Sequence, residues 1–80
     1  MDTLRTRLVA LVAEHLGQPV EQVQSARSLA DLGVDSLELI DLIATVETAF
    51  DITIPDDRLE RIDSIDQLVA AVDELALARA

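Results

Sequence analysis

Apolar residues recur at the spacing of an α-helix in three segments of this 80-residue chain, and this pattern restricts the fold more than any other feature. In the first segment Leu4, Leu8 and Leu11 fall on one helix face, and Gly17 is a suitable end for that helix. Half of the residues are hydrophobic but only one is aromatic, so the core must be built from Leu, Ile, Val and Ala. A chain of this length is expected to form one domain.

The second and third periodic segments both begin with a capping signal. Asp35 is a good N-cap with Glu38 three residues later, and Ser64 with Gln67 repeats the pattern. The second helix is predicted to bury Leu39, Ile43, Val46 and Phe50, with Leu42 at the edge of this face, and to turn Glu38, Asp41, Thr45 and Thr48 toward solvent. The last helix is predicted to bury Ile65, Leu68, Val69, Val72 and Leu75.

The connections between these segments complete the predicted fold. Residues 17–35 show no sustained period, and a segment this long is expected to be functional or to contain a short helical turn. Its predicted anchors in the core are Val20, Val23, Leu29 and Leu32. Residues 51–55 are predicted to be extended, since Ile54 precedes a proline. We therefore predict an all-α fold, a small four-helix bundle with a long first loop in one domain, 1–80. Its three main helices are about 3–16, 36–50 and 65–77, and its short helix is 56–61.

The chain is strongly acidic, with sixteen Asp and Glu residues, six Arg, no Lys and a formal net charge of −10. This charge excludes nucleic acid and anionic membrane surfaces as partners and favours a partner with a basic patch. The run of apolar residues 8–13 is too short to span a membrane, so we expect no membrane insertion. Small secreted domains usually carry disulfides, and this chain has no Cys, so we expect it to be cytoplasmic. We also expect a monomer.

The stretch D-L-G-V-D-S-L-E, residues 31–38, is the most distinctive part of the chain. It places Ser36 at the first position of the second helix, where free N–H groups and the helix dipole favour an anion such as a phosphodiester. Gly33 permits a sharp approach to that position. The competing interpretation is that Ser36 is simply a polar residue in the first turn of a helix.

This stretch is followed by an aliphatic helix ending in E-T-A-F and then by D-I-T-I-P-D-D, and the combination closely resembles the acyl carrier proteins. The resemblance covers almost the whole chain and implies a four-helix bundle whose second helix is the main recognition element. It also implies that 4′-phosphopantetheine, taken from coenzyme A, is attached to Ser36. The attachment motif of the family is matched by Asp35 and Ser36.

The resemblance also implies a partner-binding surface. Its positions in this chain are Leu37, Glu38, Asp41, Ala44, Glu47, Asp56 and Glu60. The chain departs from the family pattern modestly: Ala44 replaces a larger apolar residue, Thr48 stands where an acid is frequent, and Arg58 interrupts an acidic stretch. These departures bear on partner preference. The implied partners are a phosphopantetheinyl transferase and acyl-transferring, ketosynthase or related enzymes with basic docking patches.

Such a carrier catalyses nothing itself, so we predict no enzymatic activity, no catalytic residues and no metal site. His15 lies in line with the apolar stripe near a helix end, and no second His or Cys accompanies it. The predicted function is to carry acyl groups as thioesters for fatty acid or polyketide biosynthesis, and the aliphatic core is predicted to part and shelter the chain. The alternatives are an aminoacyl, D-alanyl or peptidyl carrier and, from another class, an acidic helical interaction module that is never modified.

Overall fold

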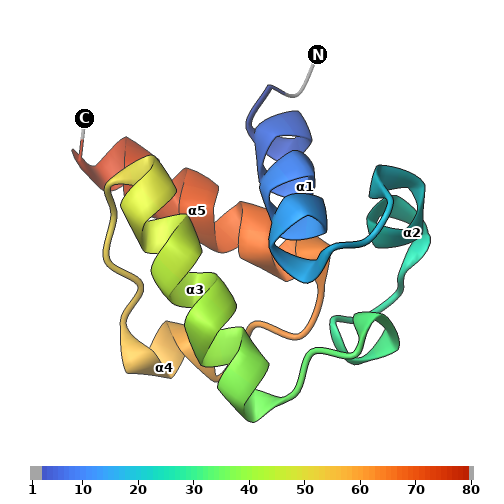
Figure 1. The fold of residues 1–80 in the computed structure, drawn as a ribbon. Helices are drawn as coiled ribbons and strands as arrows, with labels where there is room; N and C mark the ends of the chain where they lie inside the picture. The colour runs from blue at the N-terminus through green and yellow to red at the C-terminus, as the bar shows by residue number, and fades with distance from the viewer. Residues whose placement is uncertain (1–2, 80) are drawn as a thin grey trace.

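The computed structural model describes residues 3–79, and all regular structure in this range is helical. The elements are α1 (Thr3–Leu16), α2 (Val20–Ser25), the 3₁₀ helix η1 (Ala30–Leu32), α3 (Ser36–Phe50), α4 (Asp56–Leu59) and α5 (Ile65–Arg79). Figure 1 shows the three long helices packed together, with α2 on one side of the molecule and α4 on the other. The predicted all-α fold with three main helices is confirmed. None of the described helices is long and apolar enough to cross a membrane.

The predicted long first loop contains two short helical elements, α2 and η1. Val23, Leu29 and Leu32 are buried, as predicted for anchors of this segment. The prediction is wrong for Val20, which is 39% exposed. Val20 is the first residue of a six-residue helix, and a helix that short buries only its middle residue, Val23.

The core is aliphatic, and its position differs slightly from the prediction on each long helix. On α5 Val69 and Leu75 are only partly buried, and Ala71 is buried in addition to the other predicted residues. On α1 the buried residues are Leu8, Val9, Val12 and Ala13, with Leu4 and Leu11 only partly buried. On α3 the buried residues are Leu42, Ile43 and Val46, with Leu39 and Phe50 only partly buried. Leu42 is therefore at the centre of the buried face and not at its edge. Phe50 is the last residue of α3 and is partly buried. The Arg7 guanidinium lies over its ring, 4.9 Å from the ring centre.

Helices α4 and α5 each end two residues away from the predicted position. Helix α4 ends at Leu59, because the N–H groups of Arg61 and Ile62 bond to carbonyls three residues earlier and form tight turns. Helix α5 continues to Arg79. The Ser64 cap is confirmed, since its hydroxyl accepts a hydrogen bond from the Gln67 N–H at 3.2 Å.

The connector 51–55 is held to α3 by a side chain of that helix. Asp51 ends α3 in the left-handed conformation, with φ 55°, and residues 52–55 then have no regular secondary structure, with Pro55 in an extended conformation. The Glu47 carboxylate accepts a hydrogen bond from the Ile54 N–H at 2.7 Å. Ile52 and Ile54 are both buried, so Glu47 fixes a segment that contributes two side chains to the core.

Candidate functional site

Ser36 is the first residue of α3 and is exposed. The residue before it, Asp35, is the N-cap in extended conformation, and its Oδ1 accepts a hydrogen bond from the Glu38 N–H at 2.8 Å. This contact confirms the predicted cap and starts the helix at Ser36. In the part of the chain that the structure describes, the Ser36 hydroxyl has no hydrogen-bond partner, and the residue is exposed to solvent.

The turn before Ser36 is fixed by a set of backbone contacts. Gly33 has φ 82°, and a Cβ at this position would meet nothing within 4 Å, so glycine is favoured here by its conformation and not by space. The N–H groups of Gly33 and Val34 bond to the Ala30 and Leu29 carbonyls. Gln18 also donates to the Leu32 carbonyl, at 2.7 Å. Ser36 therefore follows a turn that is tied to both ends of the first loop.

An open hollow of about 300 Å³ lies beside Ser36. Its lining residues are Leu29, Ala30, Val34, Asp35, Ser36, Leu39, Ile62 and Asp63. The two sides of the hollow are joined by a 2.9 Å hydrogen bond from the Leu29 N–H to the Asp63 carbonyl. Ser36, Asp35 and Asp63 thus border a space whose other lining side chains are aliphatic, and two of these, Leu29 and Ile62, belong to the buried core.

The first two turns of α3 also present apolar side chains to solvent. Leu37 is 78% exposed and Ile40 is 58% exposed, which is unusual for residues of this size. Ala44 is exposed one turn further along the helix. The family resemblance implies contacts at Leu37 and Ala44 but does not single out Ile40, which the structure adds to this exposed apolar surface.

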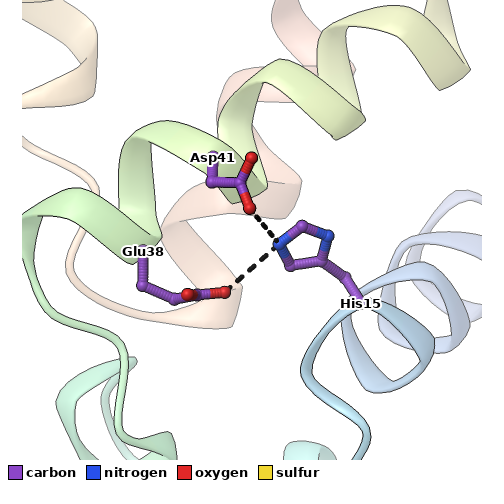
Figure 2. Close-up of side chains that lie close together, drawn as sticks. All are labelled: His15, Glu38 and Asp41. Carbon is purple, nitrogen blue, oxygen red and sulfur yellow. Dashed lines mark ion pairs between the residues drawn. The ribbon is translucent and has the colours of Figure 1, made fainter.

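The acidic side of α3 is occupied by a residue from α1, as Figure 2 shows. The Nε2 atom of His15 lies 3.2 Å from Glu38 Oε1 and 3.4 Å from Asp41 Oδ2. The other ring nitrogen, Nδ1, lies 3.4 Å from Thr45 Oγ1. The predicted solvated face is therefore partly covered: the Glu38 and Thr45 residues are half-buried against His15, while Asp41 stays exposed. No local pattern could reveal this pairing, because it depends on how α1 crosses α3.

The remaining predicted partner-binding residues do not share one environment. Asp56 begins α4 and Glu60 follows its last residue, and both are exposed. Glu47 is half-buried and holds the connector through the Ile54 N–H. The structure therefore leaves Asp56 and Glu60 open to a partner and gives Glu47 a structural contact that the sequence did not predict.

One ion pair near α4 has a resolved effect on protonation. The Arg58 guanidinium donates to Glu74 Oε2 at 2.8 Å, and this hydrogen bond, with the positive charge of Arg58, lowers the pKa of Glu74. Both groups face solvent, so the pair contributes little to stability. Arg58, which departs from the family pattern, thus contacts α5.

Comparisons with known proteins agree on the kind of chain this is. The family model of the phosphopantetheine attachment site matches residues 6–72, a range that includes Ser36. The chain is 40% identical over 75 residues to a protein of Zymomonas mobilis named acyl carrier protein. The aligned region covers 92% of this chain and 96% of that protein. The fold is similar to the crystal structure of an acyl carrier protein from Thermotoga maritima. That match has a TM-score of 0.82 and 24% identity over 99% of this chain and 98% of the other.

Proposed function

The chain belongs to the acyl carrier proteins, and we propose that Ser36 is the residue to which its phosphopantetheine group is attached. Members of this family are carriers and not enzymes, and they bear phosphopantetheine as a prosthetic group. The observation that supports Ser36 most strongly is its exposed, unbonded hydroxyl at the start of α3, directly after the Asp35 cap.

The surroundings of Ser36 fit a phosphodiester. Asp35 uses its carboxylate on the Glu38 N–H, which leaves the N–H groups of the first residues of α3 facing solvent. These groups and the positive end of the helix dipole stabilise a negative charge close to the serine oxygen.

Once attached, the group supplies a thiol at the end of a flexible arm, which holds an acyl chain as a thioester. The protein's part is to position the arm and to shield what it carries. The hollow beside Ser36 offers aliphatic side chains of Leu29, Val34, Leu39 and Ile62, so we propose that it receives the start of a short acyl chain. The side chains that would have to move aside for it are aliphatic, while the hydrogen bond from Leu29 to Asp63 holds the backbone on the two sides of the hollow together.

We propose that partner enzymes dock on the first two turns of α3. Leu37 and Ile40 are exposed apolar contacts, and Asp41 beside them provides negative charge for a basic patch. Glu38 adds charge while held by His15. Asp56 and Glu60 extend the acidic surface, whereas Glu47 contributes to it only with the carboxylate oxygen that does not hold Ile54. Such a surface suits a phosphopantetheinyl transferase and the acyl-transferring enzymes that follow it.

We propose that the acyl group belongs to fatty acid or polyketide biosynthesis. Val34 supports this branch, because peptidyl carriers usually have a glycine at the position before the Asp-Ser pair. The choice between the two pathways depends on the partners, and the acyl group found on the protein isolated from its own cells would decide it.

Attachment to Ser36 is tested by changing each candidate serine in turn. The unmodified protein is incubated with a phosphopantetheinyl transferase and coenzyme A, and its intact mass is measured. Wild type and the control variants Ser25→Ala, Ser28→Ala and Ser64→Ala should gain one phosphopantetheine, and Ser36→Ala should gain none. A mass gain in Ser36→Ala, or its loss only in one of the controls, would contradict the assignment.

A further inference from the structure

The contact of His15 with two carboxylates joins α1 to α3 and has no part in holding the prosthetic group (Figure 2). We propose that His15, Glu38 and Asp41 form a binding site for one divalent transition-metal ion of the Zn²⁺ class. One imidazole nitrogen and two carboxylate oxygens would be its protein ligands. Water would supply the remaining position.

The geometry of the three side chains fits such an ion. Their ligand atoms all lie within 4.8 Å of one another. Ligands about 2.0–2.2 Å from a tetrahedral ion are about 3.3–3.6 Å apart. The two separations from His15 Nε2, 3.2 Å to Glu38 and 3.4 Å to Asp41, are already close to these values. Only the two carboxylates need to approach each other, and the Asp41 side chain, which is 71% exposed, can rotate toward the half-buried Glu38.

The orientation of the His15 ring fits a metal ligand. Its Nε2 atom faces the Glu38 and Asp41 carboxylates. Its Nδ1 atom faces the Thr45 hydroxyl at 3.4 Å, and that hydroxyl also lies 3.2 Å from the Asp41 carbonyl oxygen. The tautomer with its hydrogen on Nδ1 donates to the hydroxyl and leaves the Nε2 lone pair as the ligand for a metal ion. The Thr45 contact is also the kind of outer hydrogen bond that fixes a metal-binding imidazole.

The ligand types and the charge around the site indicate the class of ion. A nitrogen ligand from an imidazole suits Zn²⁺ and similar ions, whereas Mg²⁺ and Ca²⁺ take oxygen ligands. The His15 side chain is only 16% exposed, so it is held in place before an ion arrives. Residues 31–66 carry eleven acids against two arginines, a net charge of −9, which attracts cations to this side of the molecule. Loose binding by that acidic surface would not depend on His15.

The test is calorimetric titration of the tag-free, unmodified protein with ZnCl₂ and separately with MgCl₂. Wild type should bind one Zn²⁺ in a saturable step. His15→Gln and the double variant Glu38→Gln/Asp41→Asn should bind it at least tenfold more weakly. The matched control Asp56→Asn/Asp57→Asn removes the same two charges elsewhere and should weaken Zn²⁺ binding less than threefold. Mg²⁺ binding should not respond to His15→Gln, and circular dichroism confirms that each variant is folded.

A measurement on wild type keeps the proposal testable even if a variant unfolds. In ¹⁵N spectra of the imidazole, Zn²⁺ should shift the Nε2 resonance of His15 strongly and the Nδ1 resonance weakly. Equal Zn²⁺ affinity in wild type and folded His15→Gln, no saturable step, or an unshifted Nε2 resonance would overturn the proposal. These measurements use no partner enzyme, so their outcome is independent of the docking role proposed for Glu38 and Asp41.

Discussion

The Glu47 carboxylate gives the sharpest stability prediction. The family resemblance implies that Glu47 binds partner enzymes, whereas its hydrogen bond to Ile54 indicates that it stabilises the fold. Its Oε2 accepts from the Ile54 N–H at 2.7 Å, and Ile54 is only 5% exposed. A hydrogen bond to a charged acceptor contributes about 1.5–3 kcal/mol, and losing the acceptor leaves the Ile54 N–H unpaired. Glu47→Ala should therefore lower the free energy of unfolding by about 2 kcal/mol.

In a domain of this size, each kcal/mol changes the midpoint of thermal unfolding by about 4–8 °C, so Glu47→Ala should lower Tm by roughly 8–16 °C. Glu47→Gln keeps an acceptor oxygen without the charge and should lose about half as much. The matched control is Glu60→Ala, which removes one negative charge from an exposed position and should change stability by less than about 0.5 kcal/mol.

The assay is thermal unfolding of the four proteins, followed by circular dichroism in one buffer of fixed ionic strength. The two alanine variants lose the same charge, so their difference reports the contact with Ile54 and not the relief of self-repulsion. A Glu47→Ala protein with the Tm of Glu60→Ala would refute the structural role of this carboxylate. Glu47 would then remain available in full to partner enzymes.

Three further outcomes are expected. Adding NaCl near neutral pH should raise Tm, and divalent cations should raise it further per equivalent, because the net charge of −10 makes the fold repel itself; a flat or falling Tm would contradict this. Charge reversal by Glu38→Lys or Asp41→Lys should slow modification by the transferase mainly at low salt, whereas Leu37→Ala should slow it to a similar degree at low and high salt; wild-type rates in folded charge reversals would exclude this docking surface for that enzyme. The pKa of Glu74, followed by carboxyl ¹³C shifts, should lie below its ordinary value and should rise in Arg58→Gln. Because the pKa of Glu74 is lower in the folded state than in the unfolded state, the small stabilisation by the ion pair is present at pH values above the unfolded-state pKa. It is lost as the pH falls through the folded-state pKa.

The fold and the position of Ser36 at the start of α3 could be predicted because their signals are local. The Asp35 cap acts on the N–H of a residue three positions away, so the start of α3 and the exposure of Ser36 follow from a few neighbouring residues. The helical period likewise places Leu8, Val12 and Val46 in the core without knowledge of the other helices.

The features that were missed depend on contacts between distant segments. Leu42 becomes the centre of the α3 face, and His15 reaches Glu38 and Asp41, only once the crossing of the long helices is known. Val20 was assigned to the core from its apolar character, but the short α2 leaves it at the rim. Hydropathy therefore predicts which segments pack together, while the packing decides which polar side chains meet.

The most direct measurement is to map the modification on wild-type protein after co-expression with a phosphopantetheinyl transferase. The protein is digested, and fragmentation of each peptide in the mass spectrometer locates the added group. We predict one phosphopantetheine per chain, on Ser36, with the peptides containing Ser25, Ser28 and Ser64 unmodified. A group located on any other serine, or a chain that stays unmodified beside an active transferase, would contradict it.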